Sequence, residues 1–156
     1  MLPSEYLQPD REKQTPGIQN DSSSSSPSAR TDEAPASVLV VEDDFLIGMQ
    51  TESALVDAGF TVVGIATTAE EALVLARQHK PLLALMDIRL AGRHDGVDAA
   101  GQIFRELGIR CLFATAHDDA HTRARAEPFQ PLGWLAKPYT MPSLVAVVRA
   151  ALLQIS

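Results

Sequence analysis

At 156 residues and 46% apolar residues, the chain is long enough for one ordinary globular domain and little more. Its net charge of −7 gives no support to nucleic-acid binding, which needs a basic face, so no nucleic-acid partner is expected. The single cysteine, Cys111, excludes an intrachain disulfide and a cysteine-based zinc site, and it fits a reducing cytoplasm. No membrane association is expected either, because the apolar stretches are too short and the N-terminus lacks a signal-peptide pattern.

Residues 1–36 differ in composition from the rest of the chain. They contain five consecutive serines, five prolines and few apolar residues, with three basic and six acidic side chains. Such a segment cannot bury enough apolar surface to offset the entropy lost on ordering. We therefore expect 1–36 to be a disordered Ser/Pro-rich tail and 37–156 to form one domain.

After the tail, short apolar runs alternate with segments of helical pattern. The expected strands are 38–42, 61–66, 82–87, 109–115 and 132–136, and the expected helices are 45–58, 68–79, 97–107, 118–127 and 140–156. Thr68 and Glu71 have the spacing of a capping box, and Gly59 and Gly108 stand where helices commonly end. Five strands alternating with five helices predict a parallel sheet with right-handed crossovers and helices on both faces.

Polar residues stand at the carboxyl ends of four of these apolar strands. They are the acidic cluster 42–44, Asp87, Thr115 and Lys137. In an open α/β sheet, ligands bind at this edge, so three acids, a hydroxyl and a lysine converge on one crevice. That combination suits a divalent metal together with a phosphoryl group.

The acids at this edge carry the metal prediction. Glu42, Asp43 and Asp87, packed closely, would raise one another's pKa unless a cation were present. A hard, oxygen-preferring ion such as Mg²⁺ resolves the repulsion. Asp44 is better placed to start the following helix, where the dipole favours an acid. The structural alternative is that the whole cluster consists of helix caps.

The order and spacing of these motifs, from about Ser37 to Ser156, resemble the receiver domain of two-component response regulators. The matching segments are VLVVEDD (38–44), LMDIRL (85–90), DG (95–96), FATA (113–116) and KPY (137–139). The resemblance implies a flavodoxin-like, doubly wound (βα)5 fold whose five parallel strands have the order 2-1-3-4-5. The DIRLAG and KPY motifs also resemble those of a subgroup of single-domain or stress-type regulators.

The resemblance also implies roles for individual residues. Asp87 would be the phosphoacceptor, assisted by the ammonium of Lys137 and the hydroxyl of Thr115. Mg²⁺ would be bound directly by Asp43 and Asp87, through water by Glu42, and by the backbone carbonyl of Arg89. The peptide bond between Lys137 and Pro138 would be cis. As plain structural alternatives, Thr115 is a strand-end cap and Lys137 a solvated turn residue.

The receiver family also supplies a switch. Phosphorylation would draw Thr115 inward, and Trp134 would rotate into the space behind it, which changes the surface of the fourth helix, fifth strand and fifth helix. The alternative is that Trp134 is ordinary core packing.

The loop after Asp87 departs from the common pattern. It reads Leu90 to Gly96, lacks the usual Met-Pro pair and reaches Asp-Gly one residue late. Arg89 and His117 could overhang the site and set the lifetime of the phosphoryl group. The alternative is that both side chains point to solvent.

The last helix, from Ser143 onward, has one charge, Arg149, and apolar residues around most of its circumference. One face belongs to the sheet, and we expect the others to be exposed unless a partner covers them. This pattern predicts a homodimer, or a kinase-docking surface, that uses the helix.

The leading interpretation is a stand-alone cytoplasmic receiver that takes a phosphoryl group from a histidine kinase and signals to another protein. It would catalyse only its own phosphorylation and dephosphorylation. A phosphorelay intermediate, a phosphate sink and a non-phosphorylated adaptor remain as alternatives. A phosphatase of the haloacid-dehalogenase type needs an acid two residues after the nucleophile, where this chain has Arg89.

Overall fold

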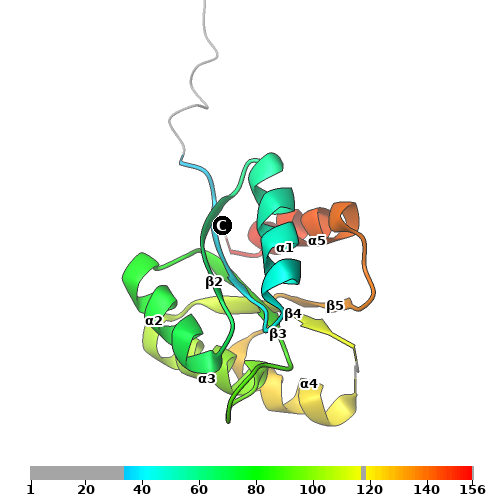
Figure 1. The fold of residues 1–156 in the computed structure, drawn as a ribbon. Helices are drawn as coiled ribbons and strands as arrows, with labels where there is room; N and C mark the ends of the chain where they lie inside the picture. Colours follow the sequence, from blue (N-terminus) through cyan, green and yellow to red (C-terminus); the bar gives the residue numbers. More distant parts are fainter. Residues whose placement is uncertain (1–33, 117–118, 156) are drawn as a thin grey trace, which may run out of the picture. The chain divides into compact units, whose positions relative to one another are not determined.

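A computed structural model of the protein describes residues 34–116 and 119–155, and within them five parallel strands form one sheet. The strand order is β2-β1-β3-β4-β5, which confirms the order that the resemblance implied. The strands are β1 (Ser37–Val41), β2 (Thr61–Ala66), β3 (Leu83–Asp87), β4 (Arg110–Thr115) and β5 (Gly133–Ala136). The helices are α1 (Phe45–Asp57), α2 (Ala69–His79), α3 (Gly96–Leu107), α4 (Ala120–Ala126) and α5 (Met141–Leu153), as Figure 1 shows.

Helices cover both faces of the sheet, so the protein has two apolar cores. On one face α1 and α5 pack over β-strand residues such as Leu83 and Leu112, with Leu144 of α5 completely buried. On the other face α2, α3 and α4 cover Met86 and Phe113. The central strand β3 is buried at all five positions, as a parallel strand covered on both sides requires.

Side-chain caps begin all five α-helices. The caps are Asp44, Thr68, Asp95, Asp119 and Thr140, each of which accepts a backbone N–H from the first turn.

The capping box predicted for Thr68 and Glu71 is only half formed. Thr68 accepts from the Glu71 N–H at 3.1 Å, but the Glu71 carboxylate accepts from the N–H of Thr67 at 2.7 Å rather than from that of Thr68. The Thr68 backbone instead pairs with Ala91 in an isolated parallel bridge. This bridge is one of the contacts that place the loop after β3.

A 3₁₀ turn between α4 and β5 was not predicted from the sequence. The turn covers Glu127–Phe129, and the Phe129 ring packs against Gly101, where an added Cβ would lie 2.7 Å from ring carbons. The predicted start of α4 at Asp118 and nearly all of the predicted tail lie outside the described residues. None of the helices in the described ranges has the length and apolar content that a membrane crossing requires.

Helix α5 buries more of its apolar surface than its sequence suggested. Val145, Val147 and Leu152 are partly buried against the core beneath the helix, as is Ile155 just after its end. Among the described residues, Leu153 is the one large apolar side chain of α5 that is exposed, at 78%. The expectation of broad apolar exposure on this helix was therefore wrong.

The larger exposed apolar surface lies on α1, which the sequence analysis did not single out. Phe45, Leu46, Met49 and Val56 are all about half exposed or more, and Leu46 reaches 71%. A surface of this kind on a small protein often marks a contact with a partner.

Candidate functional site

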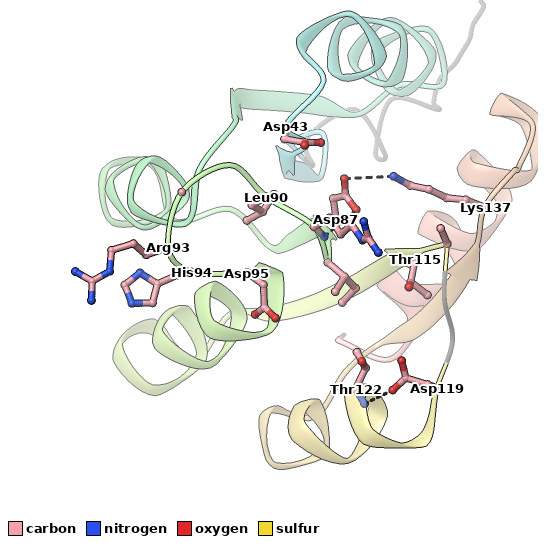
Figure 2. A pocket seen from close by; sticks show the side chains of 14 residues that line it. Asp43, Asp87, Leu90, Arg93, His94, Asp95, Thr115, Asp119, Thr122 and Lys137 are labelled. Atoms are coloured by element: carbon pink, nitrogen blue, oxygen red, sulfur yellow. Dashed lines mark hydrogen bonds and ion pairs between the residues drawn. The ribbon is translucent and has the colours of Figure 1, made fainter.

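Strand ends bring the predicted site residues to one edge of the sheet. Asp87 is the last residue of β3 and Thr115 the last of β4, while Lys137 directly follows β5. Together with Asp43 and Arg89 they border a cavity of about 670 Å³ (Figure 2). The structure therefore places the predicted acceptor, hydroxyl and lysine, with Asp43, around one space.

Three carboxylates lie close together at the carboxyl edge of the sheet. One oxygen from each of Glu42, Asp43 and Asp87 lies within 4.8 Å of the others. Glu42 is 6% exposed and Asp87 is 5% exposed, whereas Asp43 faces solvent. Lys137 Nζ lies 3.2 Å from Asp87 Oδ2 and 3.6 Å from Glu42 Oε1.

The charges in the cluster are not balanced by Lys137 alone. Burial raises the pKa of Glu42 to about 8, and a hydrogen bond and charge repulsion from Asp87 add to the effect. Burial opposes the charge on Lys137, but the carboxylates of Asp87 and Glu42 outweigh it and raise the pKa of the ammonium. A close group of three carboxylates, in which the ionisation of buried Glu42 is held back, fits a hard divalent cation.

Asp44 has the structural role predicted for it. Its carboxylate accepts from the N–H groups of Leu46 and Ile47 at 3.0 and 3.2 Å, and its own N–H donates to Glu42 at 3.2 Å. The acidic run thus divides into two residues that face the site and one that caps α1.

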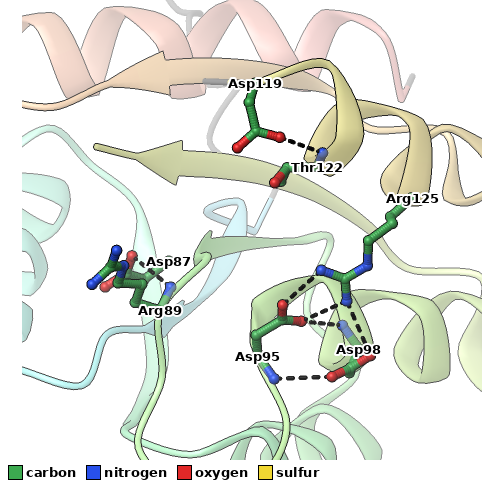
Figure 3. A network of polar contacts seen from close by, with 7 residues as sticks. All are labelled: Asp87, Arg89, Asp95, Asp98, Asp119, Thr122 and Arg125. Atoms are coloured by element: carbon green, nitrogen blue, oxygen red, sulfur yellow. Dashed lines mark hydrogen bonds and ion pairs between the residues drawn. The ribbon is translucent and has the colours of Figure 1, made fainter. Parts of the chain in front are cut away.

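The backbone that follows Asp87 is tied to its side chain. The Arg89 N–H donates to Asp87 Oδ1 at 3.3 Å, and Figure 3 shows Arg89 beside Asp87. The peptide bond between Lys137 and Pro138 is cis, as the resemblance implied. The lifetime role of Arg89 stays a prediction, and His117, the other residue named for that role, lies outside the described residues.

Trp134 lies apart from the cavity. Its ring stacks on Phe113 with centroids 4.8 Å apart, and the guanidinium of Arg123 lies 4.8 Å from the ring centroid. It is partly buried against the core, so core packing and a switching role both remain compatible with its position.

The loop after β3 is held by residues that the sequence analysis did not select. His94 Nδ1 lies 2.8 Å from Glu70 Oε2, and Arg125 of α4 pairs with Asp95 at 2.8 Å. Asp95 was noted in the sequence only as part of the Asp-Gly pair that resembles the receiver family. Its partner is 30 residues away, a separation that no local pattern could have revealed.

Comparison with known proteins agrees with this geometry. The family model for the response regulator receiver domain matches residues 38–149. The transcriptional regulatory protein PdtaR of Mycobacterium tuberculosis is 33% identical over 75% of this chain and 57% of its own length. The phyllosphere-induced regulator PhyR of Methylorubrum extorquens is 33% identical over 74% of this chain and 43% of its own length.

A solved receiver structure shows the same fold. The signal receiver domain of a modulated diguanylate cyclase from Desulfovibrio desulfuricans superposes with a TM-score of 0.70 at 32% identity. That match covers 77% of this chain and 95% of the other. The chain spans about half the length of the two curated relatives, so their whole-protein activities do not transfer with the domain. On the evidence of the family model, the relatives and the fold, the chain belongs to the family of response regulator receiver domains.

Proposed function

We propose that the protein is a phospho-accepting response regulator that receives a phosphoryl group from a histidine kinase on Asp87. The observation that carries this proposal is the pairing of Asp87 with Lys137 at 3.2 Å inside a cluster of acids. A receiver-fold adaptor would not need both a buried acceptor carboxylate and a cation beside it. A buried, paired ionisable cluster at a strand-end cavity is typical of a reactive site.

In the proposed step, a carboxylate oxygen of Asp87 attacks the phosphorus of a phosphohistidine. The bond from phosphorus to the histidine nitrogen breaks, the nitrogen keeps the bonding electrons, and an acyl phosphate forms. Lys137 would place its positive charge against the phosphoryl oxygens, and Thr115 would donate its hydroxyl to one of them. Water attack on the acyl phosphate would later return Asp87 to its carboxylate.

The acids suit a bound Mg²⁺, which would shield the charge of the phosphoryl oxygens. Asp43 and Asp87 would bind it directly, Glu42 through water, and Arg89 through its backbone carbonyl. The close approach of three carboxylate oxygens supports this assignment.

We propose that the kinase docks on α1, next to the site. The exposed side chains of Phe45, Leu46 and Met49 lie on the first turns of α1, directly after the acidic cluster. Nearby, Ile47 and Gln50 share a cavity with Lys137 and Tyr139. A kinase that covers this surface would bring its phosphohistidine to Asp87.

Output would pass through the α4–β5–α5 surface to a protein target in the cytoplasm. The net negative charge of the chain does not favour contact with DNA. A role in transcription, such as the name of PdtaR indicates for that protein, would therefore require a partner protein that binds DNA. A homodimer through α5 would be centred on Leu153. A phosphorelay intermediate or a sink would use the same chemistry and differ only in where the phosphoryl group goes next.

Intact-protein mass spectrometry after incubation with acetyl phosphate and Mg²⁺ tests the proposal. The wild type should gain one phosphoryl group and Asp87→Ala none. A wild type that stays unlabelled while Mg²⁺ still raises its stability would favour the adaptor.

A further inference from the structure

Helix α4 has little apolar packing to hold it in place. It spans Ala120–Ala126, and Ala126 is its one buried residue. At its start Asp119 accepts from the Thr122 N–H at 2.7 Å, which stabilises the helix internally but does not attach it to the fold. The position of α4 therefore depends largely on contacts of its charged side chains with neighbouring elements, among them Arg123 over the ring of Trp134.

Arg125 makes paired, charge-assisted contacts of this kind. Its two terminal nitrogens donate to the two carboxylate oxygens of Asp95 at 2.8 and 3.0 Å, and one also reaches Asp98 at 3.2 Å. The side chains of Arg125 and Asp95 are 34% and 33% exposed. Figure 3 shows this paired arrangement between α4 and the start of α3. Paired, charge-assisted hydrogen bonds fix both the separation and the orientation of their partners.

Asp95 is in turn fixed by its own helix. Its carboxylate accepts from the Asp98 N–H at 2.9 Å, and its N–H donates to the Asp98 carboxylate at 3.0 Å. This reciprocal capping box leaves Asp95 little freedom to follow Arg125 without moving the start of α3.

The start of α3 lies directly against the acceptor strand. The Gly96 N–H donates to the Ile88 carbonyl oxygen at 2.7 Å. A Cβ at Gly96 would lie 1.9 Å from the carbonyl oxygen of Asp87, so the two backbones touch with no space between them. A contiguous series of contacts therefore runs from α4 through Arg125, Asp95 and Gly96 to the backbone of Asp87.

We propose that Arg125 is a positioning residue for the acceptor, which holds the segment 88–95 beside Asp87 by tying it to α4. This proposal rests on the proposed function of Asp87. The route differs from the one through Thr115 and Trp134, which crosses β4 and β5 and meets α4 at Arg123. By linkage, a partner that prefers one position of α4 shifts the equilibrium between the phosphorylated and unphosphorylated forms of Asp87.

Hydrogen exchange in the full chain, read over 88–96 and 120–126, tests the proposal. The variants are Arg125→Gln and Asp95→Asn, the second of which keeps a good helix cap while it removes the charge from the pair. The matched control is Arg77→Gln, because Arg77 makes paired hydrogen bonds to Glu106 at 2.9 and 2.7 Å between α2 and α3, away from the acceptor.

We expect both test variants, and not the control, to speed exchange over 88–96 severalfold and to slow labelling by acetyl phosphate. Arg125→Lys, which keeps the charge but not the paired geometry, should lie between Arg125→Gln and the wild type. Faster exchange at 120–126 alone, with 88–96 and the labelling rate as in the wild type, would overturn the proposal. If Arg125→Gln also speeds exchange in β1, the variant has lost global stability. The comparison of Asp95→Asn and Arg125→Lys with the wild type then tests the proposal.

The two proposals fail in different ways. A wild type that acetyl phosphate never labels contradicts the function proposed for Asp87. The exchange of 88–96 requires no phosphorylation, so it still decides whether Arg125 holds that segment.

Discussion

The ammonium of Lys137 lies 3.2 Å from a carboxylate oxygen of Asp87, although the strands that present them are not neighbours in the sheet. β4 separates β3 from β5, so the pair spans the carboxyl edge of β4, where Thr115 ends that strand. Three strand ends are thereby joined around one cavity. A change at Asp87, Thr115 or Lys137 therefore alters a charge or a hydroxyl in the cavity that the other two residues also line.

Replacing Lys137 should impair phosphoryl transfer more than it impairs folding. Lys137→Gln removes the cation that would face the developing charge on the phosphoryl oxygens. We expect labelling by acetyl phosphate to slow on the order of 10²-fold. The time course of the intact mass measures the rate, with the exposed Lys80→Gln as control. A rate for Lys137→Gln equal to that of the control would remove Lys137 from the chemistry.

The metal-free protein should lose stability as the pH rises from about 4.5 to about 8. Burial and Asp87 raise the pKa of Glu42 to about 8, from the ordinary value of 4.5. Between these values the folded state holds a proton that the unfolded state has lost. The free energy of unfolding therefore falls with rising pH, by at most about 1.4 kcal/mol per pH unit.

Urea unfolding in a chelator at several pH values measures this slope. Glu42→Gln cannot ionise and should lose the dependence over that range. Mg²⁺ in place of the chelator should flatten the slope of the wild type, because the cation favours the ionised carboxylate. An identical slope in wild type and variant would show that Glu42 ionises normally.

A charge placed on α1 should block the kinase without harming the site. Leu46 is 71% exposed, so Leu46→Asp should leave the fold intact. We expect it to slow transfer from the cognate kinase by at least about 10-fold, the effect of losing an interface side chain that contributes about 1.4 kcal/mol or more. Labelling by acetyl phosphate should be unchanged. Leu153→Asp on α5 is the matched control, and equal loss in both variants would argue against docking on α1.

Trp134 should report the state of the protein by its fluorescence. It is the only tryptophan in the chain, and its ring is held between Phe113 and Arg123. If it moves on activation, beryllofluoride with Mg²⁺ should shift its emission in the wild type but not in Asp87→Ala. Unchanged emission under conditions in which acetyl phosphate labels Asp87 would identify Trp134 as core packing alone.

Local patterns predicted most of the fold. β2 was predicted to the residue, and the other strand bounds were within one residue, because short apolar runs end sharply at polar residues. The same sharp ends revealed Asp87 and Lys137, since parallel strands all finish at one edge. The turn at Glu127–Phe129 was missed because its stability comes from Phe129 packing on a distant glycine.

The errors at the surface have a similar cause. The sequence shows which residues of α5 are apolar but not how far they lean over the core, so the helix was expected to expose more apolar surface than it does; Val145 and Val147, for example, are partly buried. It also gives no sign that Arg125 meets Asp95, because two charges on different elements pair only when tertiary packing brings them together.

The absence of a side chain at Gly96 limits where this protein can vary. No residue with a Cβ fits against the Asp87 carbonyl, so the loop after β3 is anchored at both of its ends. Any gain or loss of length must then fall between them, over residues 90–94, where the exposed Arg93 and His94 line the mouth of the cavity. Evolution can therefore lengthen this loop, or an engineer graft a new one, and alter access to Asp87 while the backbone of Asp87 stays in place.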